Sequence, residues 1–71
     1  MSIAHDPPHK DLILEIEGFC EAFSMAPSRL GSKALGDPSF VRNLLDGREC
    51  LPRTLRKVRK FMAEYEAERA A

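Results

Sequence analysis

The sequence predicts an all-α fold, a compact bundle of four to five helices. Apolar residues recur at the spacing of a helix face in several segments, and Pro, Gly and Asp residues separate these segments as start and stop signals. No run alternates apolar and polar residues between turn residues, so strands are not expected. Because the chain has only 71 residues, we expect one small domain with a single core.

The first helix is expected from about His9 to Ser24, after a flexible arm over residues 1–8. Asp6 is a candidate N-cap, and two prolines follow it as first-turn residues. One face of this helix is predicted to enter the core through Leu12, Ile13, Ile16, Phe19, Cys20 and Phe23. Gly18 costs the helix about 1 kcal/mol relative to alanine, and we expect it to be tolerated because another helix crosses closely there.

Two shorter helices are expected next, over about Pro27 to Leu35 and about Pro38 to Leu45. A turn separates them, in which Asp37 is a good N-cap with a proline directly behind it. Gly47 can adopt the left-handed conformation in which many helices end. These signals predict a pair of short helices joined by a tight turn.

The last helix is expected from about Arg53 to Glu68, after a connecting loop. Its predicted core residues follow one another at helical spacing and are Leu55, Val58, Phe61, Met62 and Tyr65. With this helix included, residues 9–71 are expected to form a single domain.

The apolar spacing within the central pair of helices is distinctive. Small Gly31 lies inside the first helix of the pair, between the apolar residues Leu30 and Ala34, and the second helix has apolar residues at Val41 and Leu44. Gly47, Pro52 and an amphipathic helix follow. This pattern, over residues 27–61, resembles the helix-turn-helix of the phage lambda repressor and Cro superfamily, in which a small residue lets the second helix cross closely.

The chain departs from the family at the turn of the pair. Leu35 stands where the family usually has glycine, and Gly36 stands where it usually has an apolar residue. The length of the turn is unchanged by this exchange. The resemblance therefore implies a central helix-turn-helix unit over about residues 27–46.

The resemblance also implies that the helix over residues 38–45 enters the major groove of double-stranded DNA. The residues that would contact bases are Ser39, Phe40, Arg42 and Asn43. Arginine can bind O6 and N7 of guanine together, and asparagine can bind N6 and N7 of adenine. Phe40 is expected either to cover a thymine methyl group or to belong to the core.

Phosphate contacts are expected from Ser28, Arg29, Lys33, Arg48, Arg53, Thr54 and Lys57.

Charge is segregated along the chain, although the formal net charge is zero. Residues 1–24 carry five acids and one base, residues 25–60 carry nine bases and three acids, and residues 61–71 carry three acids and one base. The alternative to a binding surface is an ordinary solvated face. A basic block between two acidic ends favours contact with DNA.

Enzyme chemistry is poorly supported, because no paired catalytic residues and no Gly-rich phosphate loop occur. We expect no cofactor, no small-molecule substrate and no metal, since His5 and His9 are only two ligands and prolines lie between them. No stretch reaches the roughly 20 apolar residues of a membrane span, and we expect no secretory signal, because no basic segment followed by an apolar run occurs at the N-terminus. Cys20 and Cys50 make no disulfide framework, which suits a cytoplasmic, nucleoid-associated protein of bacterial or phage type.

These expectations lead to one functional hypothesis, a sequence-specific DNA-binding transcriptional regulator that acts as a repressor. One short recognition helix covers only about 4–5 base pairs, so we expect a homodimer on an inverted repeat with half-sites about 34 Å apart. The dimer surface is predicted at Phe61, Met62 and Tyr65. The alternative is a helical protein-interaction module, antitoxin-like or an adaptor subunit, without DNA readout.

Overall fold

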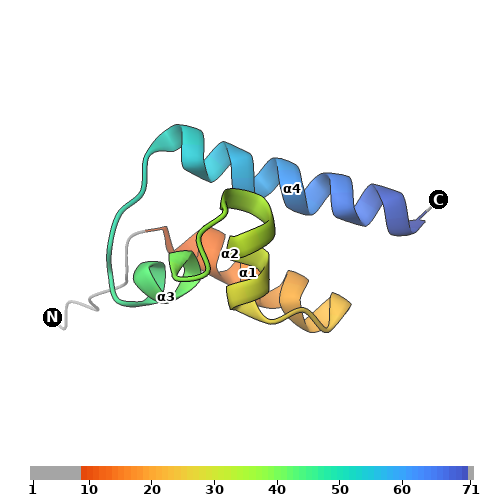
Figure 1. Cartoon of the computed structure of the whole chain (residues 1–71), viewed down its shortest axis with the longest axis horizontal. Coiled ribbons are helices and arrows are strands. Elements are labelled where there is room, and N and C mark those ends of the chain that lie inside the picture. Colours follow the sequence, from red (N-terminus) through yellow and green to blue (C-terminus); the bar gives the residue numbers. More distant parts are fainter. Residues whose placement is uncertain (1–8, 71) are drawn as a thin grey trace, which may run out of the picture.

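The computed structural model describes residues 9–70, and these residues form four helices (Figure 1). The helices are α1 (Lys10–Phe23), α2 (Pro27–Leu35), α3 (Phe40–Leu45) and α4 (Pro52–Ala70). The all-α prediction is confirmed. The predicted arm over residues 1–8, with its candidate cap Asp6, lies outside the described residues. Within the described part of the chain, none of the helices has the length and apolar character needed to span a membrane.

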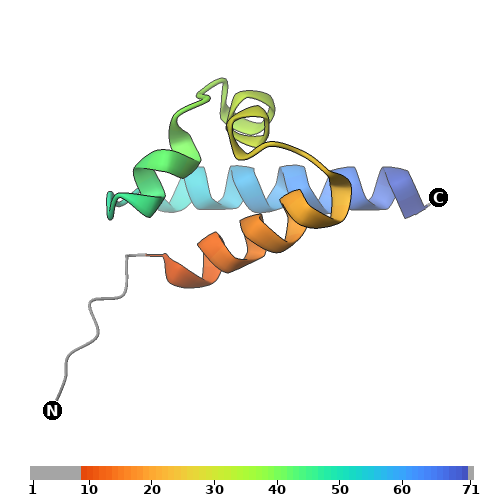
Figure 2. The ribbon, with the colours of Figure 1, turned by 90° about the horizontal axis from the view of Figure 1, so that it is seen from below.

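The helices form two layers with α4 along one edge. α2 and α3 lie on one side and α1 lies on the other, while α4 runs beside both (Figures 1 and 2). All four helices and the α1–α2 connection contribute to one core, which consists of Leu12, Ile13, Ile16, Phe19, Cys20, Met25, Leu30, Phe40, Val41, Leu44, Val58 and Met62. Most of these positions were predicted from helical spacing. Met25 was not, because it lies in the connection and belongs to no periodic pattern.

The contact between α2 and α3 depends on the absence of a side chain at Gly31. A Cβ atom at this position would overlap the carbonyl oxygen of Asp37 and would lie 3.3 Å from the Cβ atom of Phe40. The prediction of a close helix approach at Gly31 is confirmed. The same prediction for Gly18 is wrong, because a Cβ atom at Gly18 would meet nothing within 4 Å.

The turn after α2 is made by a glycine in the left-handed conformation. Gly36 has a φ of 69°, and its N–H donates to the carbonyl oxygen of Ser32 at 2.8 Å. Leu35 is therefore the last helical residue, and its half-buried side chain packs against the core. The left-handed residue therefore lies directly after the last helical residue of α2.

α3 begins at Phe40, two residues later than expected. The Asp37 carboxylate accepts a hydrogen bond from the N–H of Ser39 at 3.0 Å, and the Asp37 carbonyl accepts one from the N–H of Phe40 at 3.2 Å. Asp37 therefore caps a turn that contains Pro38 and leads into the helix. The helix itself has six residues and is about 9 Å long.

α1 and α4 meet through a cluster of aromatic rings. Phe19 and Phe23 from α1 pack against Phe61 and Tyr65 from α4, with ring centroids of the contacting pairs between 5.1 and 6.2 Å apart. Met62 beside them is only 6 % exposed and belongs to the core. Met62 is therefore unavailable to the predicted dimer surface, whereas Phe61 and Tyr65 are only half-buried, and their part in a dimer stays a prediction.

Candidate nucleic-acid interface

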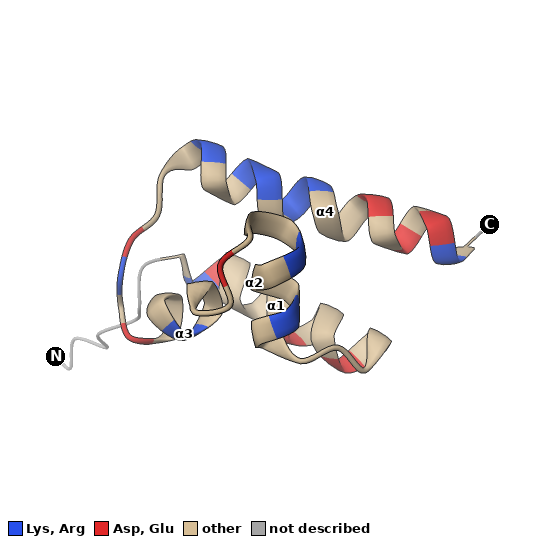
Figure 3. Ribbon diagram, viewed as in Figure 1, with Lys and Arg blue, Asp and Glu red and all other residues tan. Residues whose placement is uncertain are grey.

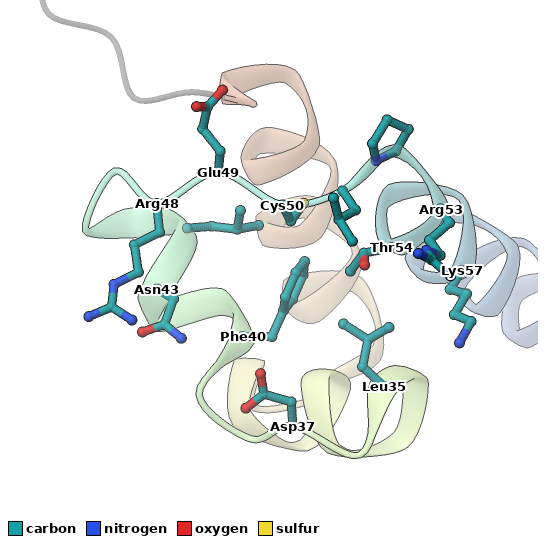
Figure 4. A pocket seen from close by; sticks show the side chains of 13 residues that line it. Leu35, Asp37, Phe40, Asn43, Arg48, Glu49, Cys50, Arg53, Thr54 and Lys57 are labelled. Carbon is teal, nitrogen blue, oxygen red and sulfur yellow. The ribbon is translucent and has the colours of Figure 1, made fainter.

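An open groove lies between α3 and the start of α4, and its volume is about 780 Å³ (Figure 4). Its floor is mainly apolar and includes Leu35, Phe40, Leu44 and Cys50. Five polar residues predicted to contact DNA also line it, namely Asn43, Arg48, Arg53, Thr54 and Lys57. The fold thus brings together side chains from a helix, a loop and a second helix.

The end of α3 places Asn43 and Arg48 on one wall of this groove. The N–H of Arg48 donates to the carbonyl oxygen of Asn43 at 3.0 Å, and Gly47 between them has a φ of 92°. This left-handed glycine ends the helix and turns the chain back, as its sequence position predicted. Figure 4 shows the polar ends of Asn43 and Arg48 close together at the same edge.

The first turns of α4 form the opposite wall. Leu51 accepts hydrogen bonds through its carbonyl oxygen from the N–H groups of Thr54, at 2.9 Å, and Leu55, at 3.1 Å. Pro52 occupies the first helical position, where its missing N–H costs nothing. Arg53 and Lys57 then lie one helical turn apart, across the groove from Arg48 (Figure 4).

A hydrogen bond connects the loop between α3 and α4, which lines the groove, to the residue before α1. The N–H of Cys50 donates to Nε2 of His9 at 3.3 Å, across 41 positions of sequence. Burial raises the pKa of the Cys50 thiol above its usual value, which keeps the group a neutral thiol at physiological pH. The sequence offers His9 only as a possible metal ligand, and no local pattern indicates this long-range contact.

The predicted reading face is divided between two hollows. A smaller hollow of about 440 Å³ lies between the start of α2 and α3, and Ser28, Ser39 and Arg42 line it. Asn43 instead lines the larger groove, because adjacent helical residues point about 100° apart. Ser39 and Arg42 therefore lie on one side of the exposed edge of α3, and Asn43 lies on the other.

Phe40 is not a base-contacting residue. Its side chain is 6 % exposed and lies in the core, where its Cβ faces Gly31 and its ring forms part of the groove floor. The expectation that Phe40 contacts bases is therefore wrong, and its other predicted role, in the core, is confirmed. Arg29 and Lys33 are exposed on α2 but line neither hollow (Figure 3).

Two carboxylates modify the charge of the groove. Asp37 and Glu49 line it together with the three cations Arg48, Arg53 and Lys57. The surplus of positive charge favours an anionic partner, while the carboxylates disfavour phosphate at their own positions. Neither acid is recognisable in the sequence as part of the site, because only the fold places them at the groove.

No protein-family model, curated protein or solved structure matches the chain. The function is therefore inferred from the residues and geometry described above.

Proposed function

We propose that this protein binds double-stranded DNA with sequence specificity and acts as a transcriptional repressor. The observation that carries the proposal is the gathering of Asn43, Arg48, Arg53, Thr54 and Lys57 around one groove beside the short helix α3. Base reading requires a planar hydrogen-bonding side chain at an exposed helix edge, and phosphate contacts at its flanks. The groove has Asn43 as the planar side chain and Arg48, Arg53, Thr54 and Lys57 as the phosphate-binding side chains.

In the proposed complex, the exposed edge of α3 lies in the major groove. Asn43 has the donor and acceptor needed for adenine, and Arg42 has the paired donors needed for guanine O6 and N7. Ser39 lies one turn before Arg42 in the same hollow and can donate to or accept from either base. α3 must hold a fixed orientation for such reading, and the close contact at Gly31 provides it.

The DNA backbone would then follow the groove between α3 and α4. Arg48 would contact phosphate from one wall, and Arg53 and Lys57 would contact it from the other. Thr54 would add a neutral hydrogen bond. A protein bound in this way represses transcription by occupying the operator, and a useful operator needs two copies because one short helix reads about 4–5 base pairs.

The test is a titration of purified protein with DNA, using duplexes enriched from a randomised pool and followed by fluorescence anisotropy. Three phosphate-contacting cations predict a plot of log affinity against log salt with a slope of roughly −3. We expect Arg53→Ala to reduce the magnitude of this slope by about 1, and the matched variant Arg56→Ala, outside the groove, to change it much less. Failure to enrich any duplex, or equal effects of the two variants, would contradict the proposal.

The alternative function, a protein-interaction module, has one observation in its favour. Leu51 is 58 % exposed at the groove, whose floor is apolar. An acidic amphipathic peptide could therefore occupy the same groove. The DNA selection separates the two functions, because a peptide-binding groove predicts weak binding to all duplexes with no preferred sequence.

A further inference from the structure

The outer face of α1 is an exposed helix face with no partner among the described residues. Leu14 is 56 % exposed on it, and Gly18 and Ala22 follow at intervals of four residues. Glycine is unfavourable inside a helix, yet among residues 9–70 no atom beyond the neighbouring backbone of α1 comes within 4 Å of where a Cβ atom of Gly18 would lie. Glu17 and Glu21 flank this line of small residues and form no ion pair with another residue of the 9–70 region.

The outer face of α4 carries the opposite charge over its first turns, up to Lys60, and Glu64 follows one turn later. Arg56 and Lys60 lie one turn apart, are exposed and form no ion pair within residues 9–70. Ala63 and Ala67 continue the same line at helical spacing. Figure 3 shows several positively charged bands on the first half of α4 and mainly negatively charged bands on its second half.

The two outer faces cannot meet inside one chain. The inner sides of α1 and α4 already meet there, where Arg59 donates to Glu15 at 2.8 Å. Glu17 is two residues from Glu15 and so lies on roughly the opposite side of α1. Lys60 is likewise turned about 100° away from Arg59. The carboxylates and cations of the outer faces can pair with each other only between two copies.

We propose that the outer face of α1 in one copy docks on the outer face of α4 in a second copy. Glu17 and Glu21 would meet Arg56 and Lys60, and the small residues on both faces would let the helices approach. Because the formal net charge of the chain is zero, no long-range repulsion opposes the approach. Exposed ion pairs of this kind give weak contacts, so the association depends on concentration and salt.

This docking is heterologous, because different faces of the two copies meet. Successive copies would therefore point in the same direction. On DNA, such an arrangement favours direct repeats over the inverted repeat expected from the sequence. This consequence rests on the proposed DNA binding, whereas the docking itself does not.

Charge exchange tests the docking without DNA, by sedimentation velocity at low salt over a range of protein concentrations. We expect Glu17→Lys/Glu21→Lys and Arg56→Glu/Lys60→Glu each to lower the association constant at least about tenfold. An equimolar mixture of the two variants pairs opposite charges again, and should recover to within about threefold of the unaltered protein. Far-UV circular dichroism checks that each variant is folded.

A variant of equal charge controls for general repulsion. Asp46→Lys/Glu49→Lys changes the net charge as much as Glu17→Lys/Glu21→Lys does, but alters neither outer face. It should retain most of the association. The proposal is overturned if the unaltered protein stays monomeric throughout, if this control loses as much association as the α1 variant, or if the mixture does not recover.

A DNA measurement then tests the consequence for operator symmetry. Two selected sites are placed about one helical turn apart, either as a direct or as an inverted repeat. We expect cooperative binding on the direct repeat only, and its loss in Glu17→Lys/Glu21→Lys. Cooperativity on the inverted repeat alone would overturn the head-to-tail arrangement. Absence of any DNA binding would instead contradict the proposed function, and sedimentation would still decide the docking.

Discussion

The two helix contacts that hold this protein together differ in kind. α2 and α3 meet at close range, with Gly31 against the backbone at Asp37. α1 and α4 meet through large aromatic rings and one exposed ion pair. A close contact with the backbone fixes the orientation of two short helices. A cluster of aromatic rings instead buries apolar surface and tolerates small shifts of the helices. The first contact therefore sets the site, and the second supplies much of the stability.

The largest effect is expected at the ring cluster. Phe19→Ala removes a buried ring that packs against Phe23, Phe61 and Tyr65, and should lower the free energy of unfolding by about 3–4 kcal/mol. Urea denaturation followed by circular dichroism measures this loss. The matched variant Leu14→Ala, on the exposed face of the same helix, should cost less than about 1 kcal/mol. Similar losses in both variants would show that the rings do not hold α1 against α4.

A smaller loss is expected at the α2–α3 contact. Gly31→Ala places a methyl group against the carbonyl oxygen of Asp37, so the free energy of unfolding should fall by about 2 kcal/mol despite the better helix propensity of alanine. Because α3 must shift to make room, the variant should also lose DNA selectivity when it is still folded. Urea denaturation measures the first effect, and titration of selected against random duplexes measures the second.

Gly18→Ala is the matched control for Gly31→Ala. The new methyl group meets nothing within 4 Å, so the helix propensity of alanine should act alone and raise the free energy of unfolding by about 0.5–1 kcal/mol. The same urea denaturation applies. If both alanine variants change stability in the same direction, the contrast between the two glycines is wrong.

The smallest effect is expected at the α1–α4 ion pair. Arg59 and Glu15 are each about half exposed, with side-chain exposures of 48 % and 49 %, so Glu15→Gln should cost less than about 0.5 kcal/mol. The hydrogen bond and charge of Glu15 raise the pKa of Arg59. A raised pKa of a base contributes stability that is lost only as the pH rises through the folded value, far above neutrality. Thermal unfolding should therefore show a small loss that is constant between pH 6 and 9 and absent at high salt.

Most of the fold was predictable, because it depends on local patterns. Leu12, Ile16 and Phe19 share one face of α1 by spacing alone, and Gly31 and Gly47 lie where the sequence placed a close contact and a helix end. The start of α3 was less accessible. The N–H of Ser39 donates a hydrogen bond to the Asp37 carboxylate. This local bond holds a turn at these residues, so the helix begins after them rather than at Pro38.

The site was predictable residue by residue but not in its arrangement. Helical periodicity placed Arg42 and Asn43 on the same polar side of one short helix, yet their side chains line different hollows. The sequence allows Phe40 to lie either in the core or at the surface, because its burial depends on how α3 packs against α2. The bond between His9 and Cys50 joins distant segments, and only tertiary packing determines such a contact.

Asn43→Ala provides the most direct test of the central claim, that α3 presents base-reading side chains beside a groove of phosphate-binding cations. Duplexes selected from a random pool by the unaltered protein are titrated with both proteins across a range of salt concentrations. The account predicts that the variant loses its preference at one base pair by about 10- to 100-fold, with the salt dependence unchanged. An unchanged preference, or an equal loss on every duplex, would contradict it.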